Sequence, residues 1–206
     1  MIAARASILA RIRRTRAGAP LARTPMSAPL PDLGADLFAR FSDRARALAS
    51  DVIGPVTLDR ALTDLATYLN DRHLPLTAVC WPQLATRNWR AAGLRVEARA
   101  ARGDDLVGIS GAFCGIAETG TLMLLSGPET PASVSLLPET HVALLPVKRI
   151  VARMEDAWAL ARREHARLPR AVNFISGPSR TADIEQTVTL GAHGPYRVLI
   201  VLTRED

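Results

Sequence analysis

The feature that most constrains the fold is the alternation of short apolar runs with longer helical patterns. Short apolar runs that end at proline, glycine or polar residues are typical of buried strands. Such runs lie at 76–81, 96–100, 121–125, 142–147, 172–175 and 198–202. Strands separated by helices usually pair in parallel, because the chain returns to the same end of the sheet. The sequence therefore predicts an α/β fold with a mostly parallel sheet flanked by helices.

Helical spacing of apolar residues predicts helices at 32–48, from Thr57 to about His73, at 150–168 and at 181–190. We expect Val52–Pro55 to end the first of these helices and His73 to lie at the C-terminal cap of the second. The run 105–110 is expected to lead into a turn or a helix start near Gly111.

The N-terminus differs in composition from the rest. Residues 3–15 read as a short helix with Ile8, Leu9 and Ile12 on one side and arginines around it, and 17–31 holds four prolines, which indicates a linker. We expect 1–31 to be a basic helix with a proline-rich linker and 32–206 to form one domain. The basic helix could dock on an acidic partner or membrane surface; a solvated helix is the simpler interpretation.

The distribution of charge argues against nucleic-acid binding. The six arginines that precede Asp32 account for the whole net charge of +6, and aromatic residues make up only 4% of the chain. No apolar run approaches the ~20 residues of a transmembrane helix. The N-terminus has no apolar signal-peptide core, and although it resembles an arginine-rich transit peptide, we expect a cytoplasmic protein.

The chain has two cysteines, Cys80 and Cys114, and no Cys-x-x-Cys motif. An iron–sulfur cluster usually needs about four thiolates, so no such cofactor is expected within this chain, and no metal spacing is present. Two buried thiols in a reducing compartment are a better explanation than a disulfide, although a disulfide stays possible.

The first candidate site loop is Ala117–Thr121, just ahead of an apolar run. Glu118 lies there between apolar segments, where a carboxylate needs a partner or a raised pKa. It could act as a general base or nucleophile. It could equally be a structural acceptor for backbone N–H groups in the turn that Thr119 and Gly120 form before Thr121.

The second candidate loop is Ser176–Glu185. If a helix begins near Thr181, its N-terminal N–H groups, the hydroxyls of Ser176, Ser179 and Thr181, and the Arg180 guanidinium would suit a carboxylate or phosphate, with Gly177 in the turn. Alternatively, Ser179 or Thr181 is only the N-cap and Arg180 pairs with a nearby acid.

Two histidines deserve comparison as site candidates. His193 lies in a glycine-rich loop beside Gly194, where backbone can approach a ligand closely, whereas His141 only precedes a strand. His193 is the better candidate, although a lone loop histidine is more often structural. We expect Glu118–Thr121, Ser176–Glu185 and His193–Gly194 to converge on one pocket at the strand ends.

Several ordered motifs carry a family resemblance. They are Ile116–Leu122, Ser135–Pro138 followed by His141–Ala143, Phe174–Glu185, and Leu190–Pro195. Together they resemble the lactate-utilisation protein C family with its LUD domain, over roughly residues 30–206. The resemblance implies the α/β fold of the isomerase and coenzyme-A-transferase-like superfamily.

The resemblance also implies a function. The protein would be the non-iron–sulfur component of a three-part system that oxidises L-lactate to pyruvate, an accessory cytoplasmic subunit whose partner subunits hold the iron–sulfur clusters. Its two loops would form one site for a small carboxylate or phosphate. The alternative is an independent enzyme of the wider superfamily that acts on a phosphorylated or CoA-linked small molecule, with Glu118 as the catalytic carboxylate.

Overall fold

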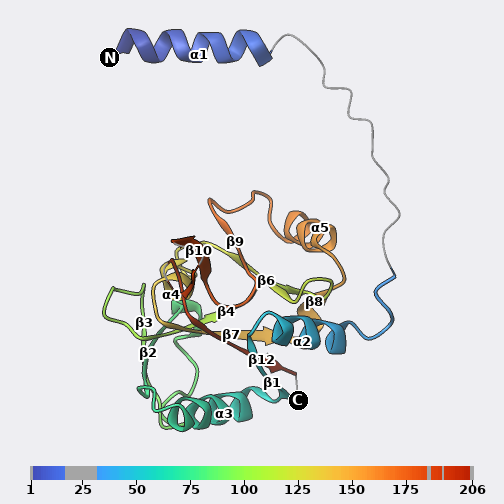
Figure 1. The fold of residues 1–206 in the computed structure, drawn as a ribbon, viewed down its shortest axis with the longest axis vertical. Coiled ribbons are helices and arrows are strands. Elements are labelled where there is room, and N and C mark those ends of the chain that lie inside the picture. The colour runs from blue at the N-terminus through green and yellow to red at the C-terminus, as the bar shows by residue number, and fades with distance from the viewer. Residues whose placement is uncertain (1, 17–31, 185–186, 192, 205–206) are drawn as a thin grey trace. The chain divides into compact units, whose positions relative to one another are not determined.

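The computed structural model describes residues 2–16, 32–184, 187–191 and 193–204, and Figure 1 shows its ribbon. Internal contacts divide the chain into two units, Met1–Asp32 and Leu33–Asp206. In the first unit, helix α1 (Ile2–Arg16) confirms the predicted N-terminal helix, and its Ile8, Leu9 and Ile12 side chains are exposed. The predicted linker at 17–31 lies outside the described residues.

The second unit is built around a six-stranded sheet in which every neighbouring pair is parallel. In spatial order its strands are β1 (Asp51–Val56), β12 (Arg197–Thr203), β7 (Thr140–Pro146), β4 (Val107–Gly111), β2 (Thr77–Cys80) and β3 (Arg95–Ala98). The inner strands β7 and β12 are almost wholly buried, which explains why their sequences are continuous apolar runs. The predicted α/β fold with a mostly parallel sheet is confirmed.

A second sheet of four strands lies beside the first. Its order is β8 (Ile150–Val151), β5 (Cys114–Ile116), β6 (Thr121–Leu125) and β9 (Val172–Ile175). Strand β6 runs antiparallel to both β5 and β9. The strands predicted at 121–125 and 172–175 therefore exist, but they belong to this sheet rather than to the parallel one.

Helices cover both sheets. Helix α3 (Leu58–Asp71) packs on β1 and β12, α2 (Leu37–Ala47) contacts β1 and β8, the short α4 (Ser133–Leu136) packs on β4 and β7, and α5 (Met154–Glu164) packs on β5 and β8 (Figure 1). Two 3-10 turns, Pro82–Leu84 and Val147–Arg149, follow β2 and β7. Helix α2 therefore bridges the two sheets, because it contacts a strand of each.

The end of α3 agrees with the prediction for His73. Its backbone is left-handed (φ 54°), its N–H donates to the Asn70 carbonyl at 3.0 Å, and the Leu74 N–H donates to the Leu69 carbonyl at 2.8 Å. This pair of bonds is the Schellman motif, which satisfies the last carbonyls of a helix. His73 thus caps α3 through its backbone, and its side chain is exposed.

Three predicted elements need correction. Val52–Pro55 is not a simple helix terminator but part of β1, an edge strand whose register shifts between Ile53 and Val56, and edge strands tolerate proline. The run 105–110 leads into β4, not a helix. The helix predicted at 150–168 is shorter, because Ile150–Val151 first pairs with β5 as β8.

The helix predicted at 181–190 is wrong. This segment forms an antiparallel hairpin of β10 (Arg180–Ile184) and β11 (Thr187–Leu190). The segment is rich in threonine, valine and isoleucine, and β-branched residues favour extended backbone over helix. No helix N-terminus therefore exists near Thr181, and the anion seat that depended on it is lost.

Candidate functional site

The two candidate loops meet in the structure. The Thr121 and Ser176 hydroxyls lie 2.7 Å apart, and the Thr119 hydroxyl donates to Thr121 Oγ1 at 2.8 Å. Thr121 is buried, whereas Thr119 and Ser176 are exposed. The loop between β5 and β6 and the loop after β9 are thus joined by a chain of three hydroxyls. We call these residues, Thr119, Thr121 and Ser176, the amino-edge cluster.

Glycines let both loops press against the C-terminal end of α2. Gly120 has φ 67°, and a β-carbon there would collide with the backbone of Arg44 and Ala45; Gly177 has φ 84°, and a β-carbon there would collide with the carbonyl of Leu48. Both positions need the left-handed backbone that glycine adopts without strain. The two glycines therefore allow the loops to pack closely against the end of α2.

The histidine-bearing loop contacts the second candidate loop through backbone. The Ser179 N–H donates to the Pro195 carbonyl at 2.7 Å, the Gly191 N–H donates to the Ser179 carbonyl at 2.9 Å, and Gly194 lies against the Ser179 side chain. The side chains of His193 and Arg180 are exposed, and that of Thr181 lies outside the described residues. The three sequence segments are therefore neighbours; that they form one pocket stays a prediction.

Glu118 is half-buried, and its backbone N–H donates to the Ala152 carbonyl at 3.0 Å. The turn after it is closed by the Gly120 N–H, which donates to the Ile116 carbonyl at 2.9 Å. Within the described part of the chain, no hydrogen bond or ion pair reaches the Glu118 carboxylate. The turn is therefore held by backbone, and a structural role for this carboxylate as its acceptor is not supported.

These loops lie at the amino edge of the parallel sheet. Leu48, which Gly177 touches, precedes β1, and Pro195, which Ser179 contacts, precedes β12. Ligands of open α/β sheets usually bind outside the opposite, carboxyl ends of the strands, where the strand order reverses. In this sheet the reversal falls between β2 and β4, since the chain runs outward from β2 to β3 and then returns to the other side of β2.

A cavity of about 1260 Å³ lies at that carboxyl edge, and we call it the carboxyl-edge cavity. Residues that follow five parallel strands line it: Leu58 after β1, Trp81 after β2, Ala112 after β4, Lys148 after β7 and Arg204 after β12. The segments 125–130 and 164–169 supply further walls. Position and size make this cavity the candidate ligand site.

The lining of the carboxyl-edge cavity combines several cationic side chains with apolar ones. Its charged residues are Arg87, Lys148, Arg149, Arg167 and Arg204, with Glu164 as the one carboxylate among the described lining residues. Its larger apolar residues are Trp81, Leu84, Phe113, Leu144 and Val147. Such an excess of guanidinium and ammonium groups favours an anionic ligand.

Arg149 organises the wall of this cavity. Its guanidinium binds both oxygens of Glu164 (2.7 and 2.9 Å), donates to the Phe113 carbonyl at 2.8 Å, and lies 4.5 Å from the centre of the Phe113 ring. The same ring is 5.6 Å from the ring of His165. The Arg149 hydrogen bonds hold the pKa of Glu164 below its usual range. Arg149 thus anchors the C-terminal end of α5, and the remaining cations of the lining are Arg87, Lys148, Arg167 and Arg204.

None of the site residues predicted from the sequence lines the carboxyl-edge cavity. Lys148 and Arg204 were missed, although each directly follows an apolar strand run, which was a usable signal. Arg87 and Arg167 lie in loops that reach the cavity only through the tertiary fold, and no local pattern marks them.

Other reactive groups are buried. His141 and Ser110 are fully buried on neighbouring strands, with His141 Nε2 2.8 Å from Ser110 Oγ. Cys80 and Cys114 are free and buried, as favoured above, and burial raises their thiol pKa values to about 11 and about 12. Among the described residues, no group of three or more histidine, cysteine or acidic side chains could hold a metal ion, and no helix is long and apolar enough to cross a membrane.

Comparisons with known proteins identify a matching family and several similar proteins. The family model described as the LUD domain matches residues 42–203. An uncharacterized protein of Neisseria meningitidis serogroup B is 46% identical over 99 residues, which cover 48% of this chain and 42% of that protein. Lactate utilization protein C of Bacillus licheniformis is 34% identical over 131 residues, covering 61% of this chain and 54% of that protein. The chain thus spans about half the length of the curated relatives it matches.

A solved structure shares the fold. The crystal structure of a DUF162 family protein from Deinococcus radiodurans superimposes with a TM-score of 0.61 at 22% sequence identity, and the match covers 85% of this chain and 99% of that one. At this identity the likeness bears on the architecture alone.

Proposed function

Because the chain belongs to the LUD domain family, we propose that it serves lactate utilisation and binds an organic anion in the carboxyl-edge cavity. The first part is supported by relatives from several bacilli that carry the name lactate utilization protein C. The second part is carried by one observation: five cationic side chains and a single carboxylate line a cavity at the carboxyl ends of five parallel strands. This proposal moves the expected anion site from the amino-edge loops to the opposite edge of the sheet.

Within such a system, we place the oxidation of L-lactate to pyruvate on partner subunits with iron–sulfur clusters, and this chain acts as an accessory component. Lactate and pyruvate are carboxylates, so they match the charge of the cavity. The cavity of about 1260 Å³ is at the upper end of pockets that hold small molecules, which are typically ~300–1,000 Å³. It therefore also has room for a larger anion, such as a phosphorylated or CoA-linked acid.

Direct binding tests the cavity. Isothermal titration calorimetry with L-lactate, pyruvate, inorganic phosphate and coenzyme A, each on the full chain, should give saturable binding for at least one of them. Lys148→Gln and Arg204→Gln should each weaken that binding roughly ten- to a hundredfold, the usual value of a charge-assisted hydrogen bond.

Arg170→Gln is the matched control, because Arg170 is exposed next to the cavity wall but does not line the cavity. Equal affinities for the control and the two cavity variants would contradict the site. Saturable binding that none of the three variants weakens would place the ligand elsewhere on the chain.

Growth tests the biological role. Deletion of the gene should abolish growth on L-lactate as sole carbon source while growth on glucose continues. Complementation with the wild-type gene should restore growth on lactate, and complementation with the Lys148→Gln and Arg204→Gln double variant should not. Unimpaired growth of the deletion strain on lactate would refute the proposed role.

A second candidate function keeps Glu118 as the catalytic carboxylate of an independent enzyme acting on a phosphorylated or CoA-linked molecule. The observation in its favour is the half-buried Glu118 carboxylate, which no described side chain pairs. Under this hypothesis Glu118→Gln removes a turnover without changing the melting temperature. Under the first proposal Glu118→Gln leaves both anion binding and growth on lactate unchanged.

A further inference from the structure

Strand β3 forms one edge of the parallel sheet and has a neighbour on one side only, β2. The amide of Arg95 donates to the Leu76 carbonyl at 2.9 Å, and the amide of Arg99 donates to the Cys80 carbonyl at 3.1 Å. Because amide direction alternates along a strand, the amides and carbonyls of Val96 and Ala98 face away from the sheet. An uncovered strand edge of this kind is a template for pairing with another strand.

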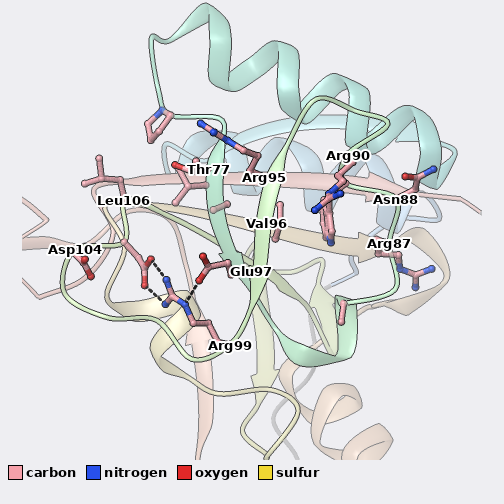
Figure 2. Close-up of a pocket in the computed structure, with 16 residues that line it drawn as sticks. Thr77, Arg87, Asn88, Arg90, Arg95, Val96, Glu97, Arg99, Asp104 and Leu106 are labelled. Atoms are coloured by element: carbon pink, nitrogen blue, oxygen red, sulfur yellow. Dashed lines mark hydrogen bonds and ion pairs between the residues drawn. The ribbon is translucent and has the colours of Figure 1, made fainter.

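A cavity of about 790 Å³ lies next to β3, between the loop that holds Arg87 and Arg90 and the loop that holds Asp104 and Leu106 (Figure 2). Its lining also includes Thr77 of β2 and Val107 of β4, so it extends over the neighbouring strands as well. Leu106, which directly precedes the inner strand β4, is 45% exposed. In the described part of the chain, no residue hydrogen-bonds the outward amides of β3.

The side chains of β3 are self-complementary in charge. Arg95 and Glu97 share one face of the strand because they are two residues apart. Both are exposed, Glu97 with 72% of its side chain accessible. A strand with one positive and one negative residue flanking Val96 can match a second copy of itself when the two run antiparallel.

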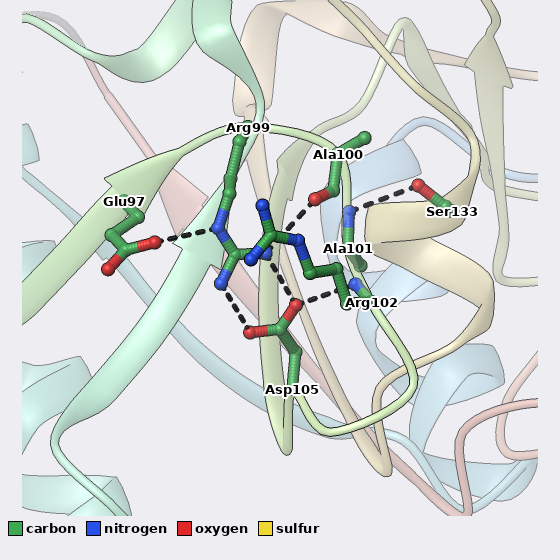
Figure 3. Close-up of polar contacts among 7 residues, drawn as sticks. All are labelled: Glu97, Arg99, Ala100, Ala101, Arg102, Asp105 and Ser133. Carbon is green, nitrogen blue, oxygen red and sulfur yellow. Dashed lines mark hydrogen bonds and ion pairs between the residues drawn. The ribbon is translucent and has the colours of Figure 1, made fainter.

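A polar network fixes the chain that follows β3. Arg99 donates to Glu97 Oε2 at 2.6 Å and binds both oxygens of Asp105 at 2.7 and 2.8 Å (Figure 3). The same loop is tied to α4 through the Ala101 N–H, which donates to Ser133 Oγ at 3.1 Å. The network uses one oxygen of Glu97 and leaves Oε1 for another cation.

We propose that two copies of this chain associate by pairing their β3 strands antiparallel about Val96, so that the parallel sheet continues from one copy into the other. Val96 of one copy then exchanges two backbone hydrogen bonds with Val96 of the other, which is one of the registers that the outward amides of Val96 and Ala98 allow. In that register Arg95 lies directly opposite Glu97 of the second copy, twice by symmetry. Pairing about Ala98 would instead place Glu97 opposite Arg99, which is already bound to Asp105 of its own chain.

Charge reversal tests the proposal, which does not depend on the proposed function. Sedimentation velocity over a range of concentrations should show a reversible dimer of the full chain. Arg95→Glu or Glu97→Arg alone should each raise the dimer dissociation constant about tenfold or more, because like charges then oppose each other in both symmetric pairs. Arg170→Glu is the control, since it makes the same charge change as Arg95→Glu at an exposed residue that precedes β9 of the other sheet, and it should leave the dimer intact.

The decisive experiment measures association in a mixture of the two single variants. An Arg95→Glu chain and a Glu97→Arg chain restore opposite charges across the pair, so their mixture should form a heterodimer while each alone stays mainly monomeric. Circular dichroism of each variant checks that the fold persists. A wild-type chain that stays monomeric at every concentration would overturn the proposal. So would a dimer that neither reversal weakens, or a mixture that does not associate.

Discussion

Protonation of His141 should limit the stability of this protein in mild acid. His141 lies on β7 with its side chain fully buried; Nε2 contacts Ser110 Oγ at 2.8 Å, and Nδ1 has no partner among the described residues. Burial lowers its pKa from 6.5 to about 4, because the charged imidazolium would lose its hydration at this buried position. The folded chain therefore keeps this ring neutral over a range in which the unfolded chain protonates it.

The sign and size of the effect follow from linkage. The folded-state pKa is below the unfolded one, so the contribution of His141 is fully present above pH 6.5 and is lost as the pH falls toward 4. Each pKa unit between the two states corresponds to about 1.4 kcal/mol, so the loss over this window is about 3 kcal/mol. That is a large share of the ~5–15 kcal/mol that stabilises an ordinary domain.

The assay is urea unfolding, followed by circular dichroism at pH values between 7.5 and 4.5, for the wild type and for His141→Gln. The wild-type free energy of unfolding should fall more steeply between pH 6.5 and 4.5 than that of the variant, by about 1 kcal/mol per pH unit or more. Carboxylates titrate alike in both chains and cancel in the difference. His73→Gln is the control, since the His73 side chain is exposed, and its profile should run parallel to the wild type.

Parallel profiles for the wild type and His141→Gln would refute the reasoning. If His141→Gln does not fold, NMR titration of the wild-type ring decides the matter. The ring resonances of His141 should not move before the protein unfolds in acid, and a midpoint near pH 6.5 in the folded state would contradict the burial argument.

Three further predictions concern the loops and the thiols. Gly120→Ala should lower the free energy of unfolding by at least about 1–2 kcal/mol, because φ is positive there. Gly103→Ala is the control, because a β-carbon at position 103 meets no other atom, and it should lower the free energy of unfolding far less. Equal decreases for the two variants would contradict the close packing at Gly120. Thr121→Val should cost about 1–2 kcal/mol by breaking the amino-edge cluster, while Thr121→Ser retains the hydroxyl and should cost less. Cys80 and Cys114 should react with a thiol reagent only after denaturation, because both are buried with raised pKa values; fast labelling of the native protein would show that these strands open.

Several elements could be predicted from local pattern because their causes are local. Strands β7 and β12 lie inside the parallel sheet, so both faces are apolar and the runs stand out. Helix α3 carries its apolar residues at helical spacing and ends in a backbone cap at His73. The helix predicted at 181–190 was wrong because the β-branched residues of this segment favour extended backbone, and its two halves pair as a hairpin.

The same distinction between local pattern and tertiary pairing applies to the candidate site. The sequence by itself determined that 118–120, 176–179 and 193–194 are loop segments near apolar strands, and that the charge excess belongs to the N-terminus. Only the tertiary structure decided at which edge of the sheet each segment lies, because strand direction and order depend on pairing between residues far apart in the chain. That pairing brings Arg87, Lys148, Arg167 and Arg204 around one cavity, although the first and the last are 117 positions apart in the sequence (204 − 87), and it leaves Glu118 at the opposite edge.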